Sequence, residues 1–504
     1  MHIHDIVASA PLERGGAIPL FRQLYGRLKD AILRGALAPG ARLPATRDLC
    51  RLLGVSRQTV LAAYEQLAAE GYLRGGVGQG TFVDEALPLA RQEHPKPGLL
   101  RPLPERGAAL AAAMEKVRYH DGPVRAFRPS MPGLDLFPFD VWRKLEMRHL
   151  RRPGPHLGYS EPWGHGPLRE LLCAYLRASR GVECTPGQII ITSGSQQALF
   201  LLAQLLLAPG DGVWVESPGY LGACAPLAVA GARLCTVPVD AEGMDVAYAA
   251  RHYPDARMVF ATPSHQLPLG VTMSLARRLD LLRWATDNRA WIIEDDYDSE
   301  YRYTGPPLAS LQGLDRAGCV VYVGTFSKVL FPGLRLGYVV APPALVEALG
   351  RAKAVLDRHN AIVPQLALAD FIAEGHFARH IRRTREAYGE RREALLDAIH
   401  ARLDDRLQCG PSDSGLDLCV HFKPLRDGSL PDETHVAQAA LDAGIELRPL
   451  SYYINAAAAT VPACAVTPGL VLGFSAVGPS DIRRGVERLE QVLRAGEGKG
   501  ARAA

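Results

Sequence analysis

The interpretation of this 504-residue chain depends on one stretch, Gly324-Thr325-Phe326-Ser327-Lys328, followed by Pro332-Gly333-Leu334-Arg335-Leu336-Gly337-Tyr338. A lysine among small hydroxyl residues can form a Schiff base with an aldehyde. The hydroxyls of Thr325 and Ser327 and the guanidinium of Arg335 can hold a phosphate. An aldehyde and a phosphate occur together on pyridoxal 5'-phosphate (PLP). The stretch therefore predicts a PLP site with Lys328 as its reactive residue.

Further polar side chains follow other strands of the predicted sheet, at the edge where ligands bind in open α/β sheets. Ser195 and Gln196 open a helix, and a helix N-terminus offers N–H donors to a phosphate. Tyr220 can stack on a pyridine ring. Asp295 can pair with the ring nitrogen and Tyr297 can hydrogen-bond the ring hydroxyl. The neighbouring Asp296 remains a second candidate for the ring nitrogen.

Short apolar runs separated by helical or turn sequence predict a buried, mostly parallel α/β sheet. The runs are residues 189–192, 212–215, 258–261, 291–294 and 320–323. Long helical stretches follow residue 353, with a few strands such as 417–422 and 469–475. This change of pattern predicts a smaller C-terminal subdomain of α+β type.

The first 83 residues have a different pattern, that of a helix-turn-helix with a wing. A helix is expected over residues 20–37 and a second over 45–53, and Gly54 permits the turn to a third helix capped by Ser56. Strands are expected at 72–74 and 81–83, on either side of a glycine-rich wing. Tyr64 is interpreted as a core residue.

This pattern predicts a DNA-binding surface. The first turn of the third helix is expected to meet base edges and phosphates in the major groove, and the other residues are expected to contact the DNA backbone. The predicted DNA-binding residues are Arg57, Gln58 and Thr59 on that turn, with Arg47, Arg74, Gly80 and Thr81 around it.

Charge and cysteine content agree with a DNA-binding protein inside the cell. The first 83 residues carry ten Lys and Arg against six Asp and Glu, which accounts for the whole net charge of +4. The nine cysteines form no CxxC pair, so no metal site is predicted and the thiols are expected to be reduced. The sequence shows neither a secretory signal nor a run long enough to span a bilayer, so we expect a cytoplasmic protein.

The motifs resemble known families. Residues 18–83 are similar to the GntR family of bacterial transcription regulators, and residues from about 120 to 495 are similar to fold-type I aminotransferases. The combination resembles the MocR/GabR subfamily. The expected organisation is a winged helix-turn-helix (14–84), a proline-rich linker (85–118) and a PLP-binding α/β domain (119–495). Its large subdomain is expected at about 165–345, and its small subdomain at about 119–160 and 350–495.

The chain departs from aminotransferases at two places. Their Asn-Pro-x-Gly loop reads Leu267-Pro268-Leu269-Gly270 here, so the contact of the Asn with the ring hydroxyl is missing or is supplied by His265 or Gln266. No Lys or Arg lies between Arg448 and Arg483, where aminotransferases place an arginine that clamps the substrate carboxylate. Arg448 is the nearest candidate. This second departure argues against efficient transamination.

The resemblance implies a PLP-dependent transcription regulator that acts as a homodimer on double-stranded DNA with paired half-sites. Its aminotransferase-like domain is expected to sense PLP itself, or a small amine or amino acid that exchanges with Lys328 at the cofactor aldehyde. The alternative is an active aminotransferase with an accessory DNA-binding head. The sequence alone does not identify the effector, the operator or the regulated genes.

Overall fold

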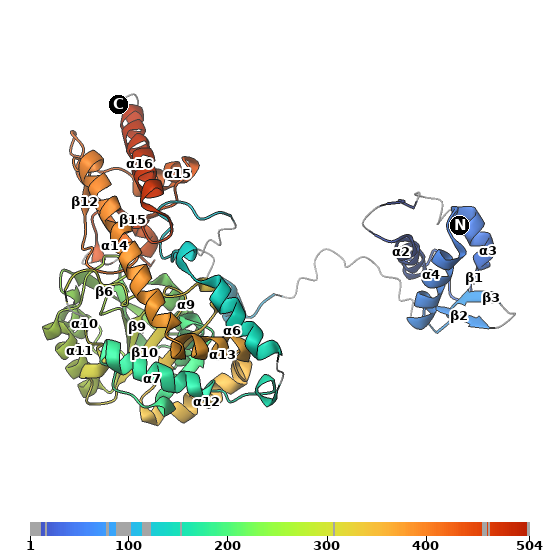
Figure 1. Ribbon diagram of the computed structural model, residues 1–504, viewed down its shortest axis with the longest axis horizontal. Helices are drawn as coiled ribbons and strands as arrows, with labels where there is room; N and C mark the ends of the chain where they lie inside the picture. Colours follow the sequence, from blue (N-terminus) through green and yellow to red (C-terminus); the bar gives the residue numbers. More distant parts are fainter. Residues whose placement is uncertain are drawn as a thin grey trace. The chain divides into compact units, whose positions relative to one another are not determined.

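The computed structural model describes residues 12–15, 18–76, 80–86, 102–112, 122–151, 154–305, 308–455, 461 and 464–500. The chain divides into two compact units, Met1–Leu103 and Pro104–Ala504 (Figure 1). Within the described ranges, no helix combines the length and the apolar character needed to cross a bilayer.

The first unit is a winged helix-turn-helix, as predicted. Its elements are α2 (Leu20–Leu33), β1 (Arg42–Leu43), α3 (Thr46–Leu53), α4 (Arg57–Ala69), β2 (Leu73–Gly76) and β3 (Gly80–Val83). The strands form an antiparallel sheet in the order β1-β3-β2. The three helices and the sheet enclose a core that includes Leu24, Leu28, Leu49, Val60 and Leu67. Tyr64 is buried, as predicted, and its hydroxyl donates to Pro44 O over 3.0 Å.

Local signals explain where these helices begin and end. Helix α3 ends at Gly54, whose φ of 61° lies in the left-handed region that favours glycine. Ser56 caps α4, because its Oγ accepts a 3.1 Å bond from Thr59 N. The first helix stops at Leu33, four residues before its expected end, since Gly35 adopts a φ of 71°. Leu37 is nevertheless buried in the core of this unit.

The second unit is built on an eight-stranded sheet of order β4-β11-β10-β9-β8-β5-β6-β7. Its strands are β4 (Ile189–Thr192), β5 (Gly212–Ser217), β6 (Arg233–Asp240), β7 (Gly243–Met244), β8 (Met258–Ala261), β9 (Trp291–Asp296), β10 (Val320–Thr325) and β11 (Gly337–Val340). The central run from β10 to β6 is parallel, whereas β11 is antiparallel to both of its neighbours. The mostly parallel sheet is therefore confirmed.

Helices cover both faces of this sheet, because successive side chains of a strand point to opposite faces. One face packs on α8 (Ser195–Leu206), α9 (Leu221–Val229) and α12 (Pro343–Asp357). The other face packs on α7 (Gly166–Arg180), α10 (Val246–His252) and α11 (Leu275–Asn288). The register shows the alternation directly: Ile190 belongs to the first core, and Ile189 and Ile191 belong to the second.

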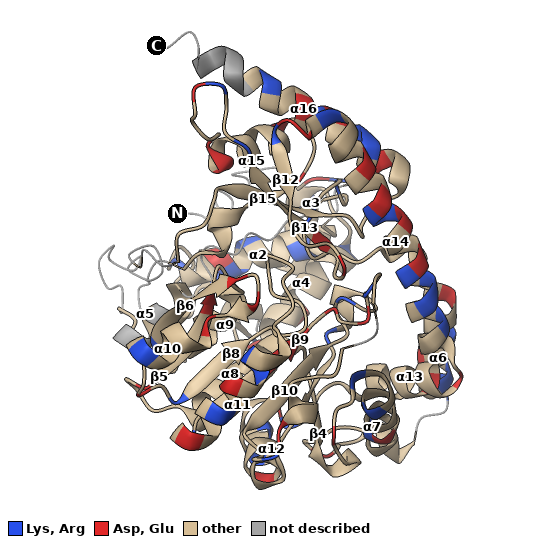
Figure 2. Ribbon diagram, turned by 90° about the vertical axis from the view of Figure 1, so that its left-hand side faces the viewer, with Lys and Arg blue, Asp and Glu red and all other residues tan. Residues whose placement is uncertain are grey.

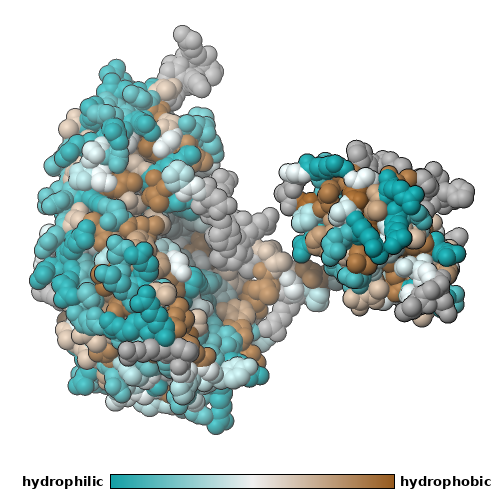
Figure 3. Space-filling view, turned by 45° about the vertical axis from the view of Figure 1, so that its right-hand side comes forward, coloured by the Kyte–Doolittle hydropathy of each residue, from teal (hydrophilic) through white to brown (hydrophobic). Residues whose placement is uncertain are grey.

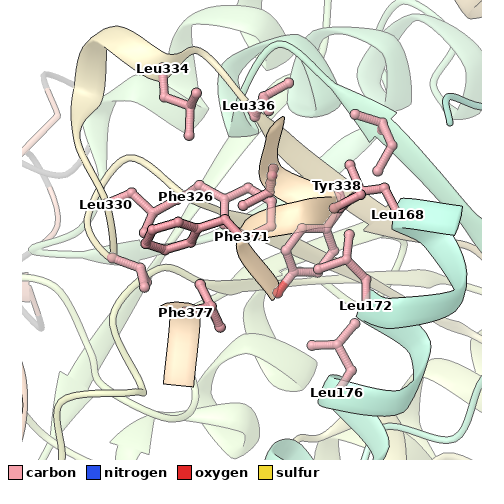
Figure 4. Packing of buried hydrophobic residues seen from close by; sticks show 14 of the residues in the cluster. Leu168, Leu172, Leu176, Phe326, Leu330, Leu334, Leu336, Tyr338, Phe371 and Phe377 are labelled. Carbon is pink, nitrogen blue, oxygen red and sulfur yellow. The ribbon is translucent and has the colours of Figure 1, made fainter. Parts of the chain in front are cut away.

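A cluster of large apolar side chains fixes the segment after Lys328 against the sheet. Figure 4 shows Phe326, Leu330 and Leu336 of that segment lying near Tyr338 of β11 and Leu172 of α7. Helices α6 (Phe139–Arg151) and α13 (Ile362–Ala373) contribute to the same cluster. Burial of these side chains, at roughly 1.5–3 kcal/mol each, holds the backbone around Lys328 in one place.

The C-terminal part forms a second, four-stranded antiparallel sheet of order β12-β13-β15-β14. Its elements are α14 (His376–Leu403), β12 (Leu407–Cys409), β13 (Asp417–Phe422), α15 (Glu433–Asp442), β14 (Arg448–Pro449), β15 (Gly469–Gly473) and α16 (Pro479–Gly500). Figure 2 shows basic and acidic residues alternating along α14 and α16. Arg402 pairs there with Glu487 at 2.8 Å and with Glu490 at 3.0 Å.

Two stretches outside these layers bear on the expected domain limits. Within the expected linker the structure describes residues 85–86 and 102–112, and α5 (Glu105–Ala112) lies in the second of these stretches. Within the first stretch expected for the small subdomain, Phe127 pairs with Gly473 of β15, whereas α6 packs on α7 and α13. Residues 77–79 of the wing lie outside the described part. Figure 3 shows apolar residues scattered among polar ones over the surface of both units.

Candidate functional site

Lys328 lies beyond the carboxyl end of β10 in a mostly acidic environment. Its Nζ donates to Ser130 O over 2.7 Å. Burial lowers the pKa of the Lys328 amine, and the nearby carboxylates of Asp417, Asp298 and Asp295 oppose that shift. A lowered pKa increases the fraction of neutral amine, which is the form that attacks an aldehyde.

The structure distinguishes the two neighbouring carboxylates at the end of β9. Asp296 points to the face occupied by α7, where it accepts from Arg180 Nη2 at 2.7 Å and from Tyr322 Oη at 2.5 Å. Asp295 points to the opposite face, and its Oδ1 is buried without a hydrogen-bond partner in the described part of the chain. Burial and the neighbouring carboxylates, Asp296 first among them, raise the pKa of Asp295 to about 7. An orphaned carboxylate of this kind fits a protonated ring nitrogen.

The start of α8 has the features of a phosphate cradle. Gly194 precedes this helix with a φ of 113°, and a Cβ added there would lie 3.3 Å from Arg335 Nη2. Arg335 is exposed, and its guanidinium forms no hydrogen bond or ion pair with the residues that the structure describes. Helix α8 begins at Ser195, so its free N–H groups and the Arg335 guanidinium face one small space. The Gln196 side chain is engaged next to this space, because its Nε2 donates to Gly222 O over 2.9 Å.

The other predicted cofactor residues surround the same space. Thr325 and Ser327 share a 3.1 Å hydroxyl contact just before Lys328. Tyr220 is half-buried at the start of α9, and burial together with the Asp295 charge raises the pKa of its phenol. Tyr297 Oη lies 3.0 Å from His265 Nδ1. The structure thus brings these segments together at the carboxyl ends of β9, β10 and the strands beside them.

The loop that departs from aminotransferases is tightly held. Gln266 Nε2 donates to Pro218 O over 2.9 Å and to Leu267 O over 2.8 Å, so this side chain stabilises the loop itself. His265 Nδ1 lies 3.0 Å from Asp298 Oδ2. Burial disfavours the charged imidazole, but the Asp298 carboxylate outweighs it and raises the pKa of His265.

Arg448, the candidate for the carboxylate clamp, lies on β14 opposite Val471 of β15. Its guanidinium stacks over the Tyr452 ring at 4.3 Å from the centroid. Within the described residues, no hydrogen bond or ion pair joins Arg448 to the acidic groups around Lys328.

Sequence reasoning missed three residues of this site. Ser130, with a φ of 59°, accepts from Lys328 through its carbonyl oxygen. Asp417, the first residue of β13, accepts from Ser130 N at 2.7 Å and from Ser130 Oγ at 2.9 Å. Asp298 is buried against His265. Of the three, only Asp298 had a signal in the sequence, since it belongs to the acidic run that follows β9.

The winged unit places part of its predicted DNA-binding set on one exposed helix turn. Arg57 and Gln58 are exposed at the start of α4. Thr59 is half-buried, and its Oγ1 lies 2.8 Å from Ser56 Oγ, so its hydroxyl belongs to the helix cap. Arg47 is exposed on α3.

The wing contributes both expected and unexpected residues. Gly80 and Thr81 lie on β3, where Thr81 pairs with Leu43. Arg74 on β2 forms an ion pair with Glu85, which neutralises part of its charge. Arg42, which the sequence reasoning missed, is exposed beside the wing, and a Cβ added at Gly80 would lie 3.1 Å from its Nε.

Comparison with known families agrees with the division of the chain into a winged helix-turn-helix and a larger second unit. Residues 20–83 match the family described as bacterial regulatory proteins, gntR family, and residues 131–464 match aminotransferase class I and II. The fold and the matches define a class of protein: a transcription regulator with a winged helix-turn-helix and an aminotransferase-like domain. Within that class, the chain belongs to the MocR/GabR subfamily of GntR-type regulators.

The similar proteins are named as regulators, and two of them match this chain over nearly their whole length. The probable rhizopine catabolism regulatory protein MocR of Rhizobium meliloti is 40% identical, over 97% of this chain and 97% of that protein. TauR of Rhodobacter capsulatus is 34% identical, over 97% of this chain and 99% of that protein. The pyridoxine biosynthesis regulator PdxR of Corynebacterium glutamicum is 35% identical, over 75% and 78%.

Solved structures match the second unit. A kynurenine aminotransferase of Pyrococcus horikoshii, solved in complex with PMP, is 28% identical with a TM-score of 0.66, over 79% of this chain and 96% of that one. The α-aminoadipate aminotransferase LysN of Thermus thermophilus is 27% identical with a TM-score of 0.65, over 77% and 94%. It was solved with N-(5'-phosphopyridoxyl)-L-leucine.

Proposed function

We propose that this regulator holds PLP on Lys328 and uses it to detect a small primary amine, and that binding of the amine changes its affinity for DNA. One observation carries the proposal: a lysine whose pKa is lowered by burial shares its site with Asp295, whose buried Oδ1 has no partner in the described residues. Structural ion pairs leave no such orphan, because an unpaired buried carboxylate is costly.

The residues fit the cofactor. When bound, PLP supplies an aldehyde that reacts with primary amines and a ring that withdraws electrons. Lys328 would hold the aldehyde, and Asp295 would hold the ring nitrogen in its protonated form. Arg335 and the N-terminus of α8 would neutralise the phosphate. The proposed site further comprises Ser195, Gln196 through its backbone, Tyr220, Tyr297, Thr325 and Ser327.

The contacts of Lys328 suggest how the signal travels. Ser130 accepts from Lys328 Nζ, and Ser130 is itself bound twice by Asp417, the first residue of β13. Attaching or releasing the lysine changes the hydrogen bonds that Nζ can give to Ser130. This change in hydrogen bonding therefore shifts the preferred position of the C-terminal sheet. A protein with two conformational states can amplify such a small displacement.

The DNA-binding part of the proposal is a homodimer that contacts paired half-sites in the cytoplasm. Arg57 and Gln58 meet base edges, and Arg47, Arg42, Arg74, Gly80, Thr81 and the backbone of Thr59 contact phosphates. A dimer places two α4 helices in successive major grooves, which fixes the half-site spacing.

The experiment combines two readouts on the full-length protein. The absorbance of the PLP-loaded protein and its affinity for duplexes from its own upstream region are measured while a panel of amines, amino acids and PLP itself is titrated. One amine that shifts both readouts without releasing a keto product supports the proposal. No visible band after adding PLP contradicts it.

The same titration distinguishes the alternative, an aminotransferase with an accessory DNA-binding head. Lys328 and Asp295 would permit proton transfer on a bound amine. Arg448 is engaged with Tyr452 and supplies no clamp for a carboxylate at Lys328 in this structure. Stoichiometric conversion of added amino acid to keto acid, with a keto acid restoring the original band, would favour the enzyme.

Replacing Arg57 with Ala is expected to weaken binding to the operator by about 1–3 kcal/mol, because one base-edge contact is lost. Fluorescence anisotropy with a labelled operator duplex, at several salt concentrations, measures the change. The matched control is Arg51→Ala on α3, whose guanidinium pairs with Asp48 at 3.2 Å. Equal losses for the two variants would contradict the assignment of Arg57.

A further inference from the structure

One buried carboxylate near Lys328 accepts hydrogen bonds from uncharged donors and has no salt bridge within the described residues. Asp298 is next to His265 at 3.0 Å, and Asp295 is the partner proposed for the cofactor ring. Asp417 is 7% exposed, and within the described part of the chain its two oxygens accept from Ser130 N and Ser130 Oγ alone. An ionised carboxylate has about four acceptor positions, so both of its oxygens retain acceptor capacity.

Asp417 is close to the place where an effector amine must react. Ser130 joins the two: its carbonyl oxygen accepts from Lys328 Nζ at 2.7 Å, and its N–H donates to Asp417 at 2.7 Å. The carboxylate is therefore separated from the reactive amine by a single residue. It also acts electrostatically on Lys328, together with Asp298 and Asp295.

The environment of Lys328 is unsuited to a carboxylate on the effector. Three buried acidic groups act on the lysine, and the guanidinium of Arg335 faces the proposed phosphate cradle at Gly194. Arg448 stacks on Tyr452. A carboxylate brought beside Asp417 and Asp298 would meet like charge in a buried site, where the repulsion is strong.

We propose that Asp417 selects the effector, which is a primary amine carrying hydrogen-bond donors, either hydroxyl groups or a second ammonium, instead of a carboxylate. One end of this molecule reacts at the position of Lys328, and a donor at its other end binds the free lone pairs of Asp417. The inference rests on the proposed function, because it names the class of amine that the PLP-loaded site detects.

The test uses the full-length, PLP-loaded protein and four amines of equal chain length. These are butylamine, 4-aminobutan-1-ol, 1,4-diaminobutane and 4-aminobutanoate, and the shift of the cofactor absorbance band gives an apparent Kd for each. We expect the alcohol and the diamine to bind about tenfold or more tightly than butylamine, and 4-aminobutanoate to bind more weakly.

Three variants assign this preference to Asp417. Asp417→Asn is expected to bring the four amines within about threefold of one another. Asp413→Asn, an equal change of charge in the exposed loop just before β13, is expected to retain the wild-type order. Ser130→Gly tolerates the left-handed backbone and removes one of the two donors to Asp417, so its preference among the amines is expected to lie between those of the wild type and Asp417→Asn. A thermal melt of each variant checks its folding.

The outcomes separate this inference from the proposed function. An unchanged preference in Asp417→Asn, or tightest binding of 4-aminobutanoate, would overturn the role of Asp417 while leaving the PLP sensor in place. The absence of a PLP band in the wild-type protein would overturn both.

Discussion

Replacing Lys328 with Ala is expected to abolish the visible band of the PLP-loaded protein and its response to amines, while its basal affinity for the operator is retained. The reason is that Lys328 is the lysine whose charge acts on the orphaned Asp295. Lys353, which is fully buried, donates instead to Asp357 over 2.9 Å. Absorbance after dialysis against PLP, and anisotropy with a labelled operator duplex, measure the two properties.

The matched control is Lys144→Ala, which removes an exposed lysine on α6 and should leave both readouts unchanged. The coupling between amine and operator is a ratio of two affinities, so in Lys328→Ala that ratio is expected to fall to about one. A variant that keeps its band would show that another lysine holds the cofactor. A variant that loses the band but keeps the coupling would show that the amine is detected elsewhere.

The parts of the fold that could be predicted from the sequence were those encoded by nearby residues. Gly54 and Ser56 mark one helix end and the next helix start, and the buried apolar runs mark β4, β5, β8, β9 and β10. Strands β6 and β11 were not predicted. Strand β6 contains Pro238 and ends in half-buried and exposed residues, and β11 has four residues directly after the lysine segment. Their pairing depends on strands far away in the sequence.

The residues of the candidate site also fall into two groups, those indicated by the local sequence and those that only the fold brings together. Lys328, Asp295 and Arg335 lie in segments where residue type and spacing indicate PLP chemistry. Asp417 and Ser130 are 287 residues apart and gain their role only when β13 lies beside the lysine. The choice between Asp295 and Asp296 could not be made from the sequence, because it depends on Arg180, which reaches Asp296 from α7.

Loss of the Arg180–Asp296 ion pair is expected to have the second large effect, a fall in the stability of the fold. Arg180 is 4% exposed, and it donates to Asp296 over 2.7 Å, to Ser264 Oγ over 3.1 Å and to Leu308 O over 3.2 Å. Replacing it with Met keeps most of the volume but leaves a buried carboxylate without its cation. The expected cost is about 3–5 kcal/mol in the free energy of unfolding, measured by urea denaturation.

The exposed Arg177, one turn earlier in α7, is the control, and Arg177→Met is expected to change the unfolding free energy by less than about 0.5 kcal/mol. The double variant Arg180→Met/Asp296→Asn tests the mechanism, because removing the orphaned charge should restore much of the loss. If the double variant is as unstable as the sum of the two single variants, the cost comes from packing and not from charge.

The pH dependence of this defect has a definite sign. Burial favours the protonated form of Asp296, but the Arg180 guanidinium outweighs it and lowers the pKa of the carboxyl below its usual value. A lowered folded-state pKa contributes stability above the unfolded-state pKa, and that contribution is lost as the pH falls. In Arg180→Met the buried carboxyl lacks its cation, so its pKa is expected to be raised and its protonation relieves the destabilisation as the pH falls from 7 toward 4. The wild type loses its own contribution only below the unfolded-state pKa. The gap between wild type and variant is therefore expected to narrow from pH 7 toward pH 4, and a constant gap would contradict the ion-pair mechanism.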